Sequence, residues 1–126
     1  MTVAYWCVLA AAILPLIATG IAKGGGERYN NRHPRAWLDK QGGYRARAAA
    51  AQANSFEAFP FFAAAVIVAH LTHAPQVRLD LLAVAFVVAR IAYVACYVAD
   101  WHWARSLVWL VGWIVCIAIF VSGVIG

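Results

Sequence analysis

Four long apolar blocks, separated by shorter polar connections, make up most of this chain. They cover residues 3–22, 48–71, 79–99 and 103–125. Each block is close to the roughly 20 residues that a helix needs to cross a hydrocarbon core about 30 Å thick. The pattern therefore predicts an all-α integral membrane protein, a four-transmembrane-helix bundle with helices at about 3–22, 44–71, 78–100 and 103–125.

The composition agrees with this interpretation. Of the 126 residues, 65% are hydrophobic and 12% are charged, whereas about 25% of the residues in soluble domains are charged. The four helices and their connections use the whole chain, so we expect a single transmembrane domain over residues 1–126. The first block has no Lys or Arg before it, which favours a spanning helix over a secretory signal.

The basic residues are distributed unevenly over the connections. Seven of them lie between the first and second blocks, whereas the connection between the second and third blocks contains only Arg78. By the positive-inside rule, the first and third connections are cytoplasmic and both termini lie outside. Topology and attraction to membrane lipids then explain the net charge of +5, and no nucleic-acid partner is expected.

Two of the predicted helices carry a polar stripe. At 100° per residue, each stripe falls within an arc of about 80°. The stripe on the second helix contains Arg47, Asn54 and Glu57, and the stripe on the third contains Arg90, Tyr93, Tyr97 and Asp100. Because the two helices run antiparallel, their stripes can face each other and form a polar cleft that opens to the cytoplasmic leaflet.

The depths of the charged residues on these stripes also match. At a rise of about 1.5 Å per residue, Glu57 lies roughly 15 Å deeper than Arg47, and Arg90 lies roughly 15 Å deeper than Asp100. A lone carboxylate at the centre of a membrane helix costs roughly 2.5–3.5 kcal/mol on insertion scales. We therefore predict that Glu57 and Arg90 neutralise each other inside the bundle. This pair either only fixes the helix register or also helps to hold a ligand.

The remaining chemistry-bearing residues form no catalytic or metal-binding pattern. The Gly24–Gly26 run lacks the ending of a phosphate loop, so we interpret it as a flexible linker. The three cysteines lie in three different blocks, which favours buried free thiols over disulfides. The histidines form no ligand cluster, and no metal is expected; they are His33, His70, His73 and His102.

Two motifs resemble those of a known family of membrane proteins. Residues 47–62 read R-A-A-A-A-Q-A-N-S-F-E-A-F-P-F-F, and residues 90–97 read R-I-A-Y-V-A-C-Y. Together they resemble the second-helix and third-helix signatures of the membrane-associated proteins in eicosanoid and glutathione metabolism, the MAPEG family. The resemblance covers essentially the whole chain, and it is to a bacterial-type member, which implies a bacterial inner membrane location.

The resemblance implies a homotrimer of four-helix subunits that binds glutathione as a co-substrate between neighbouring subunits. It assigns the glutathione site to Arg47, Asn54, Glu57, Tyr93 and Tyr97, and we add Arg90 as the partner of Glu57. Gln52 points about 140° away from Arg47, which suits a contact to a neighbouring subunit's ligand. Arg105 is the candidate catalytic residue that holds the thiol as a thiolate; its alternative role is that of a positive anchor at the membrane surface.

Three functions remain open at this point. The first is a glutathione-dependent transferase or peroxidase acting on apolar electrophiles or lipid hydroperoxides that enter from the bilayer. The second is a non-catalytic lipid-binding or scaffold protein with the same fold, and the third is a small multidrug transporter. Two departures from the family pattern disfavour eicosanoid chemistry: Ala50 replaces an arginine of the leukotriene-forming synthases, and Asp100 adds negative charge near the proposed thiol.

Overall fold

The computed structural model describes residues 1–24 and 28–125, and it is helical throughout its regular structure. The helices are α1 (Val3–Lys23), α2 (Pro34–Asp39), α3 (Gly43–Leu71), α4 (Gln76–Val98), α5 (His102–Phe120) and α6 (Ser122–Ile125). Among them, α1, α3, α4 and α5 are the four that are long and apolar enough to cross a membrane. The predicted all-helical fold with four such helices is therefore confirmed.

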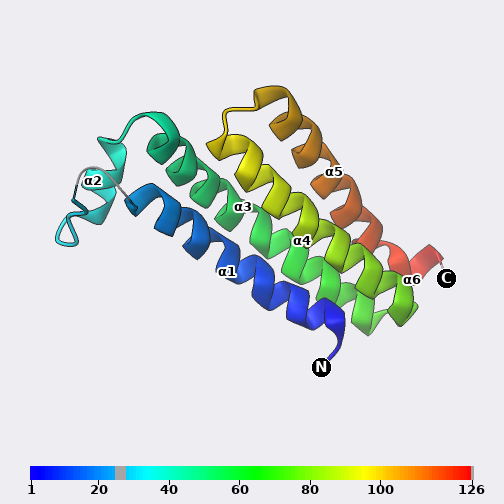
Figure 1. Cartoon of the computed structure of the whole chain (residues 1–126). Coiled ribbons are helices and arrows are strands. Elements are labelled where there is room, and N and C mark those ends of the chain that lie inside the picture. Colours follow the sequence, from blue (N-terminus) through cyan, green and yellow to red (C-terminus); the bar gives the residue numbers. More distant parts are fainter. Residues whose placement is uncertain (25–27, 126) are drawn as a thin grey trace.

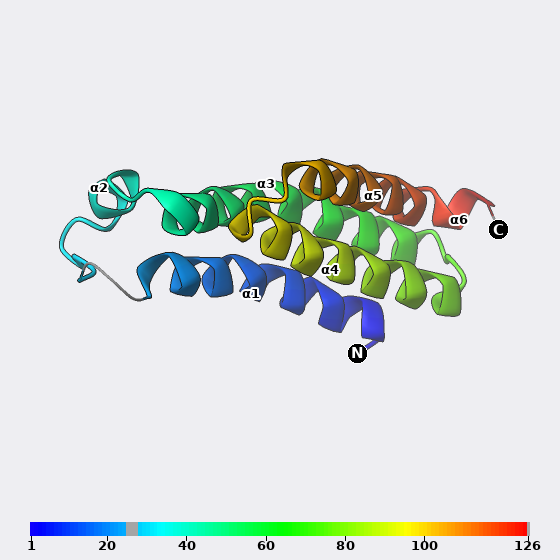
Figure 2. The ribbon, with the colours of Figure 1, turned by 45° about the horizontal axis from the view of Figure 1, so that its top comes forward.

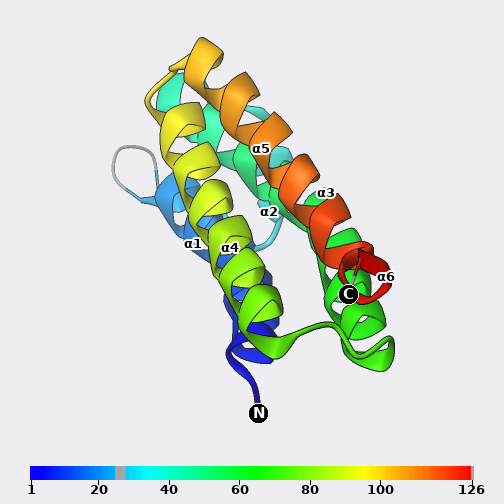
Figure 3. The ribbon, with the colours of Figure 1, turned by 90° about the vertical axis from the view of Figure 1, so that its right-hand side faces the viewer.

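The four long helices lie side by side, as Figure 1 shows. Helices α3 and α4 form the middle pair, with α1 packed on one side and α5 on the other. The two termini lie at the same end of the bundle, and α2 lies at the opposite end (Figures 1 and 2). Seen from the side of α4, α5 runs along the bundle to the short α6 (Figure 3).

Small side chains bring α1 and α3 close together. Most of the buried positions on α1 are alanines, and α3 presents alanines at both of its ends. Because these side chains are short, the two backbones can approach closely, which is how membrane helices gain packing energy without a hydrophobic driving force. Nearer the middle of the bundle, Phe62 of α3 and Phe86 of α4 stack with ring centroids 4.1 Å apart and fill the wider space between the helices.

The third helix is longer than a bilayer core requires. Its 29 residues correspond to about 43 Å at 1.5 Å per residue, compared with a core of about 30 Å. It continues through Pro60 as one helix, and its first turns carry the basic residues Arg45 and Arg47. The end of α3 that is nearest to α2 therefore extends beyond the apolar part of the bundle.

Two helix ends share the same turn with a residue in the left-handed conformation. After α3, His73 has φ 59°, and after α4, Asp100 has φ 63°. In the first turn, the Ala74 amide donates to the Ala69 carbonyl at 2.9 Å, and in the second the Trp101 amide donates to the Cys96 carbonyl at 2.8 Å. These bonds are those of a Schellman motif, which ends a helix sharply by satisfying its last carbonyls.

The connection between α1 and α3 is more ordered than the sequence indicated. The linker prediction at Gly25 and Gly26 lies outside the described residues, but the rest of the connection contains α2, which was not predicted. Trp37 of α2 is buried, and its indole donates to the Arg28 carbonyl at 2.8 Å. The guanidinium of Arg45 lies 5.5 Å from the Trp37 ring centroid and donates to the Gly24 carbonyl at 2.8 Å. A buried tryptophan therefore anchors this connection to the start of α3.

Candidate functional site

A buried arginine lies at the centre of the contact between α3 and α4. Arg90 is 4% exposed, and its guanidinium donates to the amide oxygen of Asn54 at 2.7 Å. The sequence placed both residues on facing polar stripes, and the structure brings these two stripes together. A hydrogen bond from a charged donor is stronger than one between neutral groups, so this contact connects α3 and α4 firmly.

The predicted ion pair between Glu57 and Arg90 is wrong. Within residues 1–24 and 28–125 no ion pair joins them, and Glu57 is exposed on the single chain whereas Arg90 is buried. The partner of Arg90 is Asn54, which lies three residues before Glu57 and about 4.5 Å higher along the helix. The calculated depth of the partner of Arg90 was therefore wrong by three residues, nearly one helical turn. The calculation assumes straight, parallel helices that start at the same level.

At the polar end of the bundle, Arg47 binds the end of α4 through a backbone carbonyl. Arg47 on the first turns of α3 donates from Nε to the carbonyl of Val98, the last residue of α4, at 3.1 Å. Val98 lies two residues before Asp100, the outermost residue of the polar stripe on α4. Arg47 therefore binds a free carbonyl at the end of α4, where a cation also interacts favourably with the helix dipole.

Two tyrosines lie between two arginines along α4 and the start of α5. The Arg90 guanidinium lies 4.2 Å from the Tyr93 ring centroid, and the Arg105 guanidinium lies 4.4 Å from that of Tyr97. The two tyrosine rings meet edge to face, with centroids 5.7 Å apart. A cation is attracted electrostatically to the face of an aromatic ring, so each arginine is held in place by the tyrosine beside it.

The outer part of this array lines an open cleft of about 480 Å³ between α4 and α5. We call it the Arg105 cleft; its lining residues are Tyr93, Tyr97, Arg105, Ser106, Trp109 and Leu110. Its volume is within the range of about 300–1,000 Å³ that is typical of small-molecule sites. One cation and two phenols in a cleft with apolar walls favour an anionic or thiolate group.

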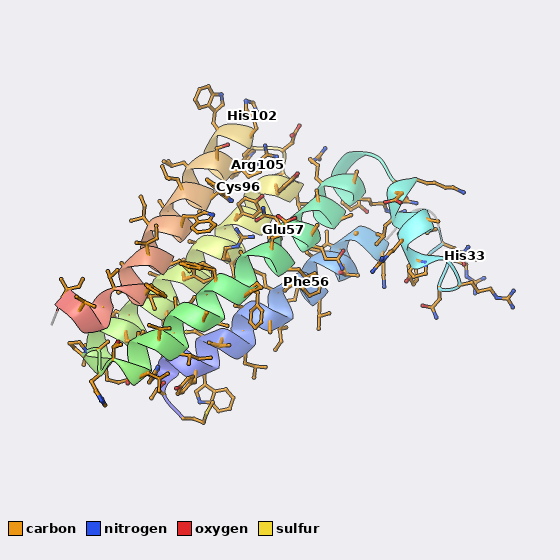
Figure 4. All side chains as sticks on the ribbon, turned by 180° about the vertical axis from the view of Figure 1, so that it is seen from behind. His33, Phe56, Glu57, Cys96, His102 and Arg105 are labelled. Atoms are coloured by element: carbon orange, nitrogen blue, oxygen red, sulfur yellow. The ribbon has the colours of Figure 1, made fainter. Side chains whose placement is uncertain are left out.

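A second hollow lies on the α3 side of Trp109. We call it the Glu57 cavity; it has about 140 Å³ and is lined by Asn54, Glu57, Ala58, Trp109 and Trp113. Figure 4 shows Glu57 on α3 and Arg105 on α5, with Arg105 nearer to the bundle end where His102 lies. The carboxylate of Glu57 suits a cationic group such as an ammonium.

Gln52 belongs to a different surface, in agreement with its predicted direction. It lines a hollow of about 380 Å³ formed by α1, α2 and α3. The other lining residues are Thr19, Lys23, Pro34, Arg35, Leu38, Ala53 and Phe56. Sequence reasoning therefore placed Gln52 correctly on a face away from Arg47. It gave no indication of α2, which supplies Arg35 to this hollow.

Sequence reasoning missed Ser106 and Trp109 as lining residues of the Arg105 cleft. The spacing contained a usable signal, because Trp109 comes four residues after Arg105 and so lies on nearly the same helix face. In the part of the chain that the structure describes, no group of three or more His, Cys, Asp or Glu side chains could hold a metal ion. All three cysteines are buried and unbridged.

Comparison with known proteins identifies one family. The family model described as MAPEG family matches residues 3–125, nearly the whole chain. Neither the search of curated proteins nor the search of solved structures found a match.

Proposed function

The chain belongs to the MAPEG family, and from this premise we propose that it is an integral membrane, glutathione-dependent transferase or peroxidase. Its acceptors would be apolar electrophiles or lipid hydroperoxides that reach the site from the bilayer. The proposal rests on two hollows that share Trp109 as a lining residue and contain side chains of opposite charge. One contains the cation of Arg105, and the other contains the carboxylate of Glu57.

Glutathione has groups that match both hollows. Its ammonium would pair with Glu57, and its thiol would lie near Arg105, where a cation favours the thiolate over the thiol. The phenols of Tyr93 and Tyr97 can donate hydrogen bonds to the same sulfur or to a carboxylate. Arg47 uses Nε to bind the Val98 carbonyl, and its two other guanidinium nitrogens can bind a glutathione carboxylate in the bidentate manner typical of arginine.

The chemistry then follows from the thiolate. In conjugation, its sulfur donates an electron pair to an electrophilic carbon, and the leaving group departs with the pair of the broken bond. In peroxide reduction, the sulfur attacks the terminal oxygen, the O–O bond breaks, and the alcohol leaves after taking a proton. A second glutathione then converts the sulfenic acid to a disulfide and water. In both cases Arg105 acts by stabilising the sulfur anion before the attack.

The exposure of Glu57 supports assembly into a trimer. A carboxylate facing lipid near the middle of a membrane helix costs roughly 2.5–3.5 kcal/mol, and a neighbouring subunit with a bound ammonium would remove this cost. The hollow beside Gln52 lies on another face of α3 and contains Lys23 and Arg35. We propose that this face receives the anionic part of a ligand held by the neighbouring subunit.

Calorimetric titration of the purified protein with glutathione tests the proposal. We expect binding by the wild type and its loss in Glu57→Gln and in Arg47→Ala. The control is Arg32→Ala, which removes an exposed arginine of the α1–α3 connection and should leave binding unchanged. Turnover with a panel of apolar acceptors then tests catalysis, and a protein that binds glutathione but converts no acceptor would contradict the transferase proposal.

The alternative is a non-catalytic protein that binds lipid between subunits. It is favoured by Ala50, which offers no cation where the leukotriene-forming members have an arginine. A wild type that binds no glutathione in the titration would support this alternative. The small multidrug transporter is disfavoured by membership of the MAPEG family.

A further inference from the structure

Trp109 of α5 lines three of the hollows of this bundle. It lines the Arg105 cleft, the Glu57 cavity and a third, smaller cavity of about 20 Å³. This smallest cavity lies between α3, α4 and α5, and Arg90 and Cys116 are among its lining residues. The Arg105 cleft shares no lining residue other than Trp109 with either of the other two.

The position of Trp109 on α5 explains why it separates these spaces. It follows Arg105 by four residues, so its side chain lies within about 40° of the same face and about 6 Å further along the helix. On its far side the Trp113 ring lies 6.1 Å away, and Trp113 in turn lies 5.3 Å from Phe61 of α3. The indole is therefore supported by an aromatic row that reaches across to α3.

The proposed function requires one ligand to use groups on both sides of this indole. The ammonium of glutathione would lie at Glu57 and its thiol at Arg105, so the peptide must pass along Trp109. Whatever is attached to the sulfur then extends from the Arg105 cleft toward the apolar part of the bundle. The first large side chain that it meets on α5 is Trp109.

We propose that Trp109 sets the size of the acceptor group that can be joined to the glutathione sulfur. Its indole is the wall between the Arg105 cleft and the two inner cavities, and a smaller side chain opens the cleft into them. This inference rests on the proposed function and names the residue that limits its substrates. The chemical class is an apolar group attached to sulfur, with a narrow group favoured over a wide one.

The alternative is that Trp109 only anchors the helix at the membrane surface. Trp103 illustrates such an anchor, because it is 82% exposed and lines none of these three hollows. Trp109 is 42% exposed and lines all three. Trp113 is a closer control, because it lines the two inner cavities and is not part of the Arg105 cleft.

Binding of S-substituted glutathiones to the full-length protein tests the proposal without relying on turnover. The probes are glutathione itself, S-methylglutathione and S-(1-naphthylmethyl)glutathione, with dissociation constants measured by calorimetry in detergent. In the wild type we expect the naphthyl probe to bind more weakly than the methyl probe. In Trp109→Ala the ratio of the two constants should shift by at least about tenfold in favour of the naphthyl probe, which corresponds to about 1.4 kcal/mol.

Two control variants and one milder variant complete the test. Trp113→Ala and Trp103→Ala should keep the ratio within about twofold of the wild type. Trp109→Leu, which keeps an apolar side chain, should shift the ratio in the same direction by a smaller factor, and it replaces Trp109→Ala if that variant does not fold.

The outcomes separate the inference from the proposed function. If the wild type binds glutathione and the Trp109 variants leave the ratio unchanged, the role of Trp109 is refuted and the proposed function stands. A shift of equal size in Trp113→Ala would also refute it, because that residue does not line the Arg105 cleft. If the wild type binds neither glutathione nor its conjugates, both are refuted.

Discussion

Arg90 is held inside the bundle by a neutral partner, and this changes the role available to Glu57. A guanidinium that is 4% exposed needs acceptors, because burying an unpaired charge is costly. The Asn54 amide and the Tyr93 ring supply them within α3 and α4. The Glu57 carboxylate is thus not required to neutralise Arg90, and its charge remains available to a ligand or to a neighbouring subunit.

This arrangement predicts opposite outcomes for two neighbouring substitutions. Asn54→Ala removes the acceptor of a buried charged donor and should lower the free energy of unfolding by about 2–3 kcal/mol. Glu57→Gln breaks no hydrogen bond within the described residues and should change it by less than about 0.5 kcal/mol. Thermal or denaturant unfolding of the two variants in detergent measures both values. A larger loss of unfolding free energy in Glu57→Gln than in Asn54→Ala would contradict this prediction and support an ion pair between Glu57 and Arg90.

At the scale of the helices, apolar block length predicted the four long helices closely, because a membrane span is defined by length and composition alone. The facing of the two polar stripes was also predictable, since Asn54 and Arg90 follow from helical periodicity. The exact partner of Arg90 was not predictable, because a shift of one turn between two helices still leaves their polar stripes facing each other. Helix α2 escaped prediction because its six residues make fewer than two helical turns, which is too short to show a period. Trp37 is stabilised by contacts with Arg28 and Arg45, which lie outside this helix.

The turn after α3 offers a substitution that stabilises the protein. His73 has φ 59° and is exposed, so its side chain contributes little packing while its backbone adopts a conformation that disfavours a Cβ. His73→Gly should keep the Schellman hydrogen bonds and raise the free energy of unfolding by about 1 kcal/mol. Unfolding in detergent measures the change. His73→Ala is the control and should give no gain, because alanine retains the Cβ; equal effects of both variants would contradict the argument.

At the scale of the whole molecule, polarity follows the long axis of the bundle. The end with α2 carries the basic connection, the start of α3 and the mouth of the Arg105 cleft, whereas the opposite end carries both termini (Figure 1). The proposed reaction would join water-soluble glutathione to apolar acceptors, and a site near one end of the bundle and open to the apolar region suits both. The orientation in the membrane would then decide from which compartment glutathione is drawn.

The positive-inside rule predicts this orientation, and the buried native cysteines make it measurable. We expect the basic connection to face the cytoplasm and both termini to face outward. Cys7, Cys96 and Cys116 are at most 8% exposed, so labelling of the wild type with a membrane-impermeant maleimide should be weak. In intact cells the reagent should modify Val124→Cys, whose parent residue is 85% exposed, and should spare Arg32→Cys until the cells are permeabilised. The reverse pattern would place the basic connection outside the cell. The Arg105 cleft would then open on the outer side, which would contradict a reaction that uses cytoplasmic glutathione.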